Sequence, residues 1–437
     1  MSTILFWFRS DLRLHDQPAL HAAMHSGATH LLPVVCLPST DETTPWGFAR
    51  VGPHRHAFAA AALRDLGARM AVLGNPLIRC HDPPATALPA LAQAVGATTV
   101  VCEDIAAPYE QSEVAALRAA GLQVRAVWHS SLLQPADMPW PAAELPGVFT
   151  AFRQKVERAG IAPPAPLPVP SMLLPPPVLS SAVLQAVGAG QGAFTAAINH
   201  PGGDDPRSSF PYATAACDGG ETAALAHLAQ YLARRLPHSY KATRSGLTGI
   251  DYSSKFSPWL ATGALSARQV YADLKTFERD QGANDGTYWL WFELLWRDYF
   301  RLLHWQYGAA LYRVQGLSAL PLAPHNTQGF ERWCQGRTGE PLVDAAMREL
   351  AATGYLSNRL RQVVASYLVH DLQGDLRAGA AWFESQLVDY DVYSNQANWL
   401  YIAGRGTDPR GGRRFNPIKQ AQEHDADGRY RRLWGTA

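Results

Sequence analysis

A short stretch near the end of the chain, residues 389–401, combines polar and aromatic side chains whose types suggest chemistry. It reads D-Y-D-V-Y-S-N-Q-A-N-W-L-Y, with two carboxylates two residues apart, an Asn four residues further on, and then Trp and Tyr separated by one residue. A helix that only packs against a core needs no such set. A pocket that holds a polar heterocycle close to aromatic rings does need one, so the stretch predicts part of a ligand pocket.

A cluster of hydroxyl groups lies in D-Y-S-S-K-F-S-P-W-L, residues 251–260. Ser253, Ser254 and Ser257 offer hydroxyls and turn amides beside Lys255, and Pro258 permits a helix to start. Hydroxyls, backbone N–H groups and a helix N-terminus are what a pyrophosphate requires. Taken alone, however, the cluster is more typical of ordinary helix capping.

An acidic residue on an otherwise apolar helix marks a third candidate, in Y-W-L-W-F-E-L-L-W-R-D-Y-F-R at residues 288–301. At 3.6 residues per turn, Glu293, Trp296 and Arg297 share one face of this helix. A buried carboxylate is unfavourable without a partner. The pattern therefore indicates either a polar pocket or an intrahelical ion pair between Glu293 and Arg297, and the residues alone leave both open.

Basic residues gather in two further places. Asn358, Arg359 and Arg361 follow a glycine in T-G-Y-L-S-N-R-L-R, and residues 405–432 hold eight Arg or Lys against four Asp or Glu. A basic rim beside aromatic residues is typical of a site for single-stranded nucleic acid or an extruded base. The alternatives are a buried Arg–Asp pair, a solvated basic face and a solvated C-terminal tail.

The elements that must position these residues begin with an alternation of short β-branched runs and Ala- and Leu-rich segments. Strands are predicted at residues 4–8, 31–37, 69–73, 98–102 and 124–128, and helices at 57–66, 85–95 and 113–120. Strands that alternate with helices indicate a Rossmann-like, doubly wound α/β domain with a parallel sheet. No G-x-G-x-x-G follows the first strand, which argues against a standard dinucleotide site there.

A proline-rich connector and a long helical region follow. Eight of the nineteen residues 162–180 are Pro, which excludes a helix or a central strand, and a Gly-, Asp- and Pro-rich tract continues to residue 220. Helices are predicted at residues 222–236, 266–280, 288–307, 342–353, 357–372 and 379–388. The sequence thus predicts an α/β domain over residues 1–131, a linker over 132–220 and an all-α domain over 221–437.

Composition limits the class of protein. The chain has 437 residues, 47% of them hydrophobic and 17% charged, and a net charge of +1, which fits two globular domains and excludes a strongly polyanion-seeking chain. The five Cys residues show no C-x-x-C pair and no metal-ligand spacing, which favours a reduced cytosol and no metal site. Without a signal peptide or a long apolar run, we expect a cytoplasmic monomer with no membrane segment.

Together these motifs resemble the photolyase/cryptochrome family, and within it the DASH cryptochromes. The similarity runs almost end to end, from F-W-F-R-S-D-L-R-L-H-D-Q-P-A-L at residues 6–20 to Y-R-R-L-W at 430–434. The segments F-E-L-L-W-R-D-Y-F, G-E-P-L-V-D-A-A-M-R-E-L and R-R-F-N-P-I-K-Q-A, with the serine cluster at residues 251–260, make it specific. The resemblance implies that the helical domain holds FAD in a bent shape, with adenine folded under isoalloxazine.

For FAD, the resemblance implies ligands from each of these motifs. Residues 253–257 would hold the phosphates with Tyr240, and Arg361 would pair with Asp389 against the flavin. Asp391 would accept a hydrogen bond from the polar edge of the flavin, and Asn395 would face its N5 atom. The implied cofactor residues are Tyr240, Ser253, Ser254, Lys255, Phe256, Ser257, Arg297, Arg361, Asp389, Asp391 and Asn395.

The resemblance also implies a DNA substrate that carries pyrimidine dimers. Glu293 would hydrogen-bond the paired thymines, Trp296 and Tyr401 would flank the extruded cyclobutane dimer, and Asn358 would line the same cavity. Tyr401 stands where many photolyases have Trp, and Tyr there is typical of the DASH branch, which favours single-stranded DNA. The implied DNA contacts are Arg244, Arg359 and Arg414.

The chain departs from the family where electrons usually reach the flavin. Photolyases commonly use three tryptophans, of which the proximal one corresponds to Trp399. The middle position is Leu376, and residues 316–328, where the outer Trp would lie, contain no Phe, Tyr or Trp. Candidates for another route are Trp333, Trp382, Tyr390 and Tyr393. We therefore expect photoreduction by a non-standard chain, or slow photoreduction, that Trp399→Phe nearly abolishes.

The resemblance favours light-driven repair of cyclobutane pyrimidine dimers, chiefly in single-stranded DNA. A dimer leaves a single strand more easily than a duplex, and reduced FAD supplies the electron under light. One alternative is a blue-light receptor that binds FAD and signals without repair, although such a receptor needs no dimer-shaped pocket. A dark electron-transfer flavoprotein is another, which the basic C-terminal rim disfavours.

An antenna pigment is a further possibility that the resemblance raises. In the family a folate, methenyltetrahydrofolate, sits between the two domains near an acidic residue. The candidate acids in this chain are Glu110 and Glu103, of which Glu110 is our choice.

Overall fold

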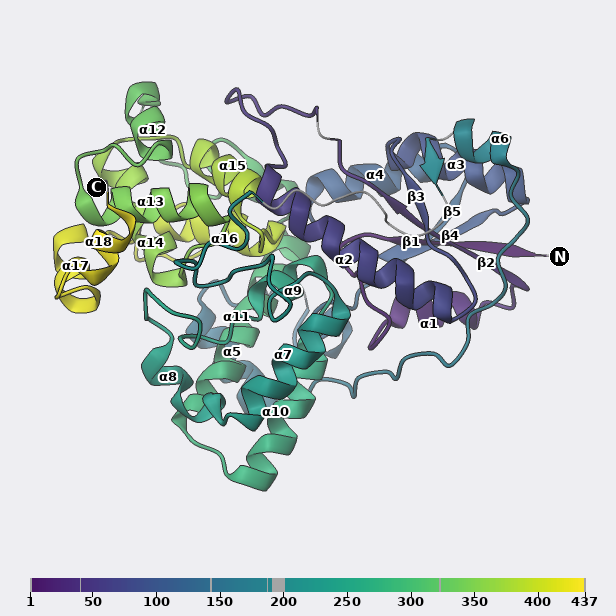
Figure 1. The fold of residues 1–437 in the computed structure, drawn as a ribbon, viewed down its shortest axis with the longest axis horizontal. Helices are drawn as coiled ribbons and strands as arrows, with labels where there is room; N and C mark the ends of the chain where they lie inside the picture. Colours follow the sequence, from purple (N-terminus) through teal and green to yellow (C-terminus); the bar gives the residue numbers. More distant parts are fainter. Residues whose placement is uncertain are drawn as a thin grey trace.

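An α/β part and a helical part lie side by side in the chain (Figure 1). The computed structural model describes residues 2–39, 41–141, 144–186, 188–190, 201–321 and 324–435. The N-terminal part is built on a largely parallel sheet, and helices make up the C-terminal part. The predicted fold class is therefore confirmed.

A six-stranded sheet with the order β5-β4-β1-β2-β3-β6 forms the centre of the α/β part. Its first five strands pair in parallel, and the short β6 pairs antiparallel with β3. β1 and β2 are buried along nearly their whole length, as strands of a parallel sheet covered on both faces must be. The strands are β1 (Thr3–Phe8), β2 (His30–Cys36), β3 (Ile78–Cys80), β4 (Thr99–Glu103), β5 (Gln123–Val127) and β6 (Ala189–Gly190).

Helices cover both faces of this sheet because successive side chains of β1 point to opposite sides. Phe6 and Phe8 belong to a core that includes residues of α1 and α2, whereas Leu5 and Trp7 belong to a core that includes residues of α3 and α4. This is the doubly wound arrangement that the sequence predicts. The helices are α1 (Pro18–Met24), α2 (Pro53–Val72), α3 (Pro84–Val95) and α4 (Pro108–Ala119).

The predicted strand at residues 69–73 is wrong. These residues are the last turn of α2 and the residue that caps it, and the third strand is instead β3. Leu63, Leu66 and Met70 are buried at helical spacing, while Val72 is 87% exposed. The apolar face of a long helix therefore overrides the short β-branched run at its end.

The region predicted as a linker contains more structure than its composition suggests. Residues 162–180 form no helix or strand, as their prolines require. Before them, however, α5 (Phe149–Ala159) buries Phe149, Phe152 and Val156 on one face and packs on the helical part. A short α6 (Ser181–Ala186) follows. The predicted Gly-rich tract falls partly outside the described residues, and the three domain boundaries stay predictions.

The helical part contains all six predicted helices, with one difference. The helix predicted over residues 357–372 ends as α14 at Ser366 and continues as a π-helical turn, Tyr367–Asp371. No helix among the described residues is long and apolar enough to cross a membrane. The helices are α7 (Glu221–Ala233), α8 (Tyr240–Thr243), α9 (Ser257–Thr262), α10 (Ala267–Gln281), α11 (Asp285–Tyr307), α12 (Thr327–Cys334), α13 (Pro341–Thr353), α14 (Asn358–Ser366), α15 (Leu376–Gln386), α16 (Val392–Ala403), α17 (Pro417–His424) and α18 (Arg429–Trp434).

The long helix α11 carries a buried histidine near its end. Because a carbonyl can only accept, Nδ1 of His304 donates to the Phe300 carbonyl at 2.8 Å, and Nε2 then accepts from the Tyr312 hydroxyl at 3.1 Å. Burial lowers the pKa of His304 to about 4. The ring is therefore held neutral at pH 7.

Candidate functional site

A cavity of about 400 Å³ opens between helices of the C-terminal part. Its walls include α8, α9 with the loop before it, and helices α11, α14, α15 and α16. Every residue of the predicted cofactor set lines it, and so do Arg244, Glu293, Trp296, Asn358, Trp399 and Tyr401. Motifs that lie far apart in the sequence thus meet around one space.

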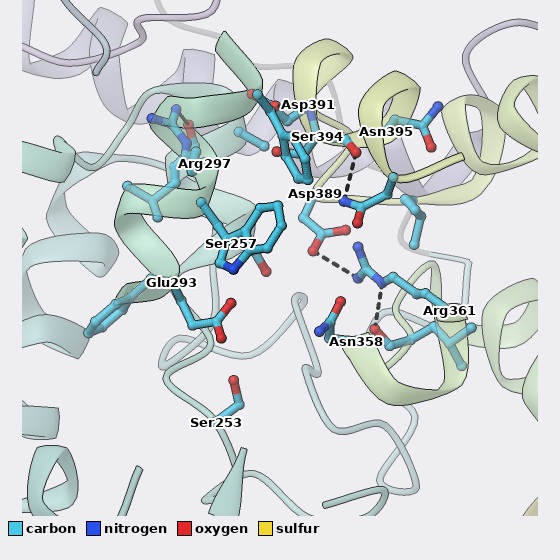
Figure 2. Close-up of a pocket in the computed structure, with 18 of the residues that line it drawn as sticks. Ser253, Ser257, Glu293, Arg297, Asn358, Arg361, Asp389, Asp391, Ser394 and Asn395 are labelled. Carbon is cyan, nitrogen blue, oxygen red and sulfur yellow. Dashed lines mark hydrogen bonds and ion pairs between the residues drawn. The ribbon is translucent and has the colours of Figure 1, made fainter. Parts of the chain in front are cut away.

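Asp389, in the turn before α16, forms a buried ion pair at one wall of the cavity (Figure 2). Its Oδ2 lies 2.8 Å from a terminal nitrogen of Arg361, whose Nε donates to the Leu356 carbonyl at 2.8 Å. The other oxygen, Oδ1, is buried and has no hydrogen-bond partner among the described residues. An acceptor so placed is available for a polar group of a ligand.

Asp391 caps α16 and lies among positive charges. It accepts from the backbone N–H of Ser394 at 2.7 Å, and Arg301 lies 3.9 Å away. Burial acts to raise the pKa of Asp391, but Arg297, Arg301 and Ser394 outweigh it and hold that pKa below its usual value. Asp391 is therefore a fixed anion at neutral pH.

Asn395 sits in the first turn of α16 with its amide fixed. Its Nδ2 donates to the Ala380 carbonyl of α15 at 3.0 Å, which settles which end of the amide is nitrogen. The two acids precede the helix and Asn395 lies one turn into it, so the spacing noted in the sequence brings all three to the cavity wall.

The serine-rich loop before α9 wraps another part of the cavity in a strained form. Ser253 and Lys255 have φ values of 59° and 58°, a left-handed conformation that residues other than glycine rarely adopt. The Lys255 Nζ lies 3.1 Å from the ring centroid of Tyr252 and has no hydrogen-bond partner among the described residues. Burial lowers the pKa of Lys255 well below its usual value, and an anionic ligand beside it would favour its charged form.

The mouth of the cavity holds the acid and the aromatic residues predicted to meet DNA. Glu293 pairs with Arg244 at 2.8 Å, while Arg297 donates to the Leu260 carbonyl at 3.1 Å. The intrahelical pair between Glu293 and Arg297 that the sequence left open is therefore not formed. Burial raises the pKa of Glu293, which Arg244 only partly opposes.

Trp296 and Tyr401 stand near each other in the cavity wall, each held by a residue that the sequence did not single out. Their ring centroids are 6.2 Å apart, at an angle of 66°. Phe149 of α5 stacks on Trp296 at 3.8 Å with nearly parallel planes, and Arg413 donates to the Tyr401 hydroxyl at 2.7 Å. Both rings thus have fixed orientations.

Two predicted DNA contacts lie outside this cavity. Arg359 has its guanidinium 5.7 Å from the ring centroid of Phe415, and Arg414, whose side chain is 67% exposed, pairs with Asp371 at 2.6 Å. Arg244 lines the cavity but is already engaged by Glu293. Any contact of these arginines with DNA stays a prediction.

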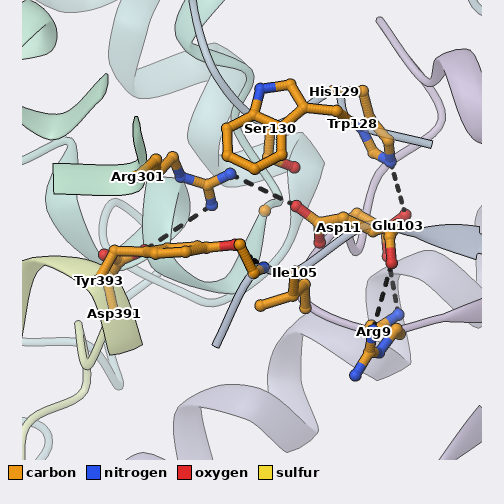
Figure 3. A network of polar contacts seen from close by, with 12 residues as sticks. Arg9, Asp11, Glu103, Ile105, Trp128, His129, Ser130, Arg301, Asp391 and Tyr393 are labelled. Atoms are coloured by element: carbon orange, nitrogen blue, oxygen red, sulfur yellow. Dashed lines mark hydrogen bonds and ion pairs between the residues drawn. The ribbon is translucent and has the colours of Figure 1, made fainter. Parts of the chain in front are cut away.

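Buried charges also join the α/β part to the cavity (Figure 3). Arg301 of α11 lies 3.6 Å from Glu103 at the end of β4 and 3.9 Å from Asp391. Its guanidinium also lies over the ring of Tyr393, at 4.5 Å from the centroid. One arginine therefore neutralises a carboxylate from each part of the chain.

A second cavity of about 230 Å³ lies between the two parts. Glu110 lines it, together with Arg9, Arg55 and Tyr390. Burial raises the pKa of Glu110, and its Oε2 is buried without a hydrogen-bond partner among the described residues. Glu103, the other predicted acid, faces Arg301 instead.

The main cavity fits a ligand such as FAD on its own chemistry. It offers an unsatisfied acceptor at Asp389, an unpaired buried ammonium at Lys255, a fixed anion at Asp391 and an aromatic wall at Trp399. A flavin has polar ring atoms and an apolar face, and its pyrophosphate is anionic, so each of these groups meets a matching partner.

Comparisons with known proteins agree with this geometry. The model of the FAD binding domain of DNA photolyase matches residues 289–436, and that of DNA photolyase matches residues 4–171. A cryptochrome DASH of Gloeobacter violaceus is 41% identical, over 99% of this chain and 85% of its own length. The chain belongs to the photolyase/cryptochrome family, in its DASH cryptochrome branch.

Solved structures of a cryptochrome and of a photolyase show the same fold. The Synechocystis sp. cryptochrome superposes with a TM-score of 0.89 at 41% identity, covering 99% of this chain and 88% of that one. A class III photolyase of Agrobacterium tumefaciens superposes with a TM-score of 0.79 at 28% identity, covering 99% and 86%. The match to the FAD binding domain of DNA photolyase, together with the chemistry of the main cavity, identifies FAD as the cofactor of this chain.

Some of the residues that shape the site carry only weak signals in the sequence. Phe149 was detectable in principle, because Phe149, Phe152 and Val156 have helical spacing inside the span predicted as linker. Arg413 and Glu103 give no such signal, since only the folded chain brings them to Tyr401 and Arg301.

Proposed function

We propose that the protein uses light to split cyclobutane pyrimidine dimers, chiefly in single-stranded DNA. One observation carries the proposal: Glu293, Trp296, Asn358 and Tyr401 line the same cavity as the cofactor set. A dimer placed against these residues would lie next to the flavin site. FAD, when bound and reduced, supplies the electron that opens the cyclobutane ring under light.

The protein's own residues would bind and orient the dimer. Trp296 and Tyr401 form an inclined pair of apolar faces for the two joined bases. Glu293 would hold the polar edge of a thymine, and its raised pKa favours the protonated form that can donate to a carbonyl. Asn358, exposed at the start of α14, would complete these contacts. The reaction requires no nucleophile from the protein.

The preference for single strands rests on the energy needed to extrude the dimer. Taking a base out of a duplex costs a few kcal/mol, and this cost is smallest when the strand is already unpaired. Tyr401 presents a smaller ring than the Trp of many photolyases. Arg244 pairs with Glu293, and Arg414 with Asp371, so a contact of either arginine with a DNA phosphate would replace an existing ion pair.

Repair of two matched substrates would test the proposal. Purified, chemically reduced protein would be illuminated with near-ultraviolet or blue light, with either a dimer-containing single-stranded oligonucleotide or the corresponding duplex. The return of thymine absorbance measures repair. We expect repair of the single strand, little repair of the duplex and none in the dark.

Variants sharpen this test. E293Q should slow repair without loss of FAD, whereas E278Q, at a Glu of α10 that pairs with the exposed Lys275, should behave as wild type. If neither substrate is repaired while FAD is bound and fully reduced, the proposal is wrong. The protein is then better explained as a blue-light receptor.

We also propose that the second cavity binds a folate antenna through Glu110. The cavity lies between the two parts and offers an unsatisfied carboxyl oxygen beside Arg9 and Arg55. Near-ultraviolet absorbance beyond that of FAD in the purified protein, lost in E110A, would support it. Spectra accounted for by FAD alone after addition of the folate would contradict it.

We further propose, as the sequence predicts, that the protein is a cytoplasmic monomer.

A further inference from the structure

A row of neighbouring aromatic rings leads from the flavin cavity to the surface without including position 376. Trp399 lines the cavity, and the centroid of its ring lies 6.3 Å from that of Trp333 in α12, at an angle of 75°. Phe330, one turn earlier in α12, stacks beside Trp333 at 6.0 Å. Trp46 follows at 6.4 Å from Phe330.

The tryptophans of this row are buried near the cavity and partly exposed at the other end. Trp399 is 2% exposed and Trp333 is fully buried, whereas Trp46 is only half-buried. Trp46 lies between β2 and α2, in a loop of the α/β part that packs on the helical core containing Trp333. The row therefore begins at the flavin wall and ends where solvent reaches an indole.

The side chains are of the right type to pass an electron. An indole can lose one electron while it keeps its proton, and electron transfer is fast between rings in near contact. The Trp333 N–H donates to the Val364 carbonyl at 3.0 Å, which fixes the ring. Phe330 is harder to oxidise than a tryptophan, so it is not itself oxidised. It fills the space between Trp333 and Trp46 through which the electron passes.

The other candidates lack these features. Leu376 has no aromatic ring. Among the described residues, Trp382 neighbours Phe48 at 5.0 Å, and Phe48 lies 6.4 Å from Phe330, so an electron from Trp382 would have to cross two Phe rings to reach Trp333, whereas one from Trp46 crosses one. Oxidation of a tyrosine requires loss of the phenolic proton, and burial raises the pKa of both Tyr390 and Tyr393.

We propose that electrons reach the flavin along Trp46, Trp333 and Trp399. With FAD bound and excited by light, Trp399 would give up one electron and become a radical cation. Trp333 then reduces Trp399, and Trp46 reduces Trp333, so the missing electron moves to the surface.

In the last step, a small thiol in solution acts as the reductant that returns Trp46 to its starting state. The Trp46 radical cation releases its indole proton to water, and the thiol then transfers a hydrogen atom to the neutral radical. Two thiyl radicals combine to a disulfide. The nearby Arg377 is ion-paired with Asp375, so no unbalanced cation opposes oxidation of Trp46. The proposal rests on FAD binding and not on repair.

Substitution of each tryptophan by Phe tests the route. The FAD-loaded protein would be illuminated with blue light and a thiol, while flavin photoreduction and the tryptophanyl radical absorbance are followed by time-resolved spectroscopy. In W333F and W46F we expect photoreduction to slow by about tenfold or more, which corresponds to a barrier raised by about 1.4 kcal/mol. The radical in W333F should also decay faster, because it cannot leave Trp399.

W382F is the matched control and should photoreduce like wild type. Bound FAD reports that each variant is folded, and W46F decides the question if W333F does not retain FAD, because Trp46 lies at the surface. Unchanged photoreduction in W46F, or slowing in W382F alone, would overturn the proposed route. Repair by chemically reduced W333F should persist, so failure of this route and failure of the repair function are distinguishable.

Discussion

Replacement of Asp389 by Asn removes one half of the buried ion pair at the flavin cavity. The Asp389 side chain is 1% exposed and that of Arg361 is 22% exposed, and their contact is 2.8 Å. Removal of one partner from a buried pair costs about 3–5 kcal/mol, because a charge is left uncompensated. Arg361 keeps its bond to the Leu356 carbonyl, so we expect D389N to lower the free energy of unfolding by about 3 kcal/mol, at the lower end of that range.

The same variant should weaken FAD binding. Asp389 Oδ1 lies at the cavity and has no partner among the described residues, and a hydrogen bond to a charged group contributes about 1.5–3 kcal/mol. Loss of that charge should raise the Kd for FAD by about 10- to 150-fold. Urea denaturation measures the first effect, and a titration of flavin fluorescence measures the second.

The chain offers a matched control in D371N. Asp371 and Arg414 are 2.6 Å apart, but their side chains are 26% and 67% exposed, and exposed pairs contribute only about 0–1 kcal/mol. D371N should therefore keep both its stability and its FAD affinity. If D389N binds FAD as tightly as D371N does, Asp389 is not a cofactor ligand and the reasoning from its free oxygen fails.

Three further predictions follow from other contacts. F149L removes the ring stacked on Trp296, a contact worth about 0.5–1.5 kcal/mol, so affinity for dimer-containing DNA should fall about two- to tenfold while FAD affinity is unchanged; equal DNA affinity would show that the stacking does not matter. The pKa of His304 is about 4 in the folded protein and about 6.5 unfolded, so protons bind the unfolded chain first as pH falls. The free energy of unfolding should thus drop by up to about 3 kcal/mol between pH 7 and pH 4. Urea denaturation at both pH values measures this drop, which should be smaller in H304N. Because burial raises the pKa of Glu293, repair should become faster as pH falls toward that pKa, and a pH profile of E293Q should lack this limb.

Much of the fold follows from local sequence features. β1 and β2 are short runs of mostly apolar residues, and α11 begins at Asp285, directly after Asn284, whose side chain caps the helix together with Thr287. Such signals depend on neighbours in the chain, which is why they can be recognised there. The strand predicted at residues 69–73 failed because the fold extends α2 through it, and the apolar face that extends the helix is decided by packing on the sheet.

The site divides in the same way. Residue types within one motif, such as the acids that precede α16 and Asn395 in its first turn, indicate a pocket by their chemistry and spacing alone. Contacts between residues that lie far apart in the sequence cannot be recognised in this way. Glu293 could have paired with Arg297 in its own helix, but Arg244 of another segment binds it instead, since only the folded chain sets which cation lies within reach.

The α/β part contributes to the flavin site through shared walls and shared charge. Ala261, Tyr390 and Asp391 line both cavities, so these three residues separate a ligand in one cavity from a ligand in the other. Arg301 balances Glu103 of β4 as well as Asp391, and neither carboxylate is exposed to much water that could screen it. A change of charge on Glu103 would therefore alter the field at Asp391, because the buried arginine between them is common to both. The N-terminal domain thus helps to set the electrostatic environment of the flavin, in addition to providing the second cavity.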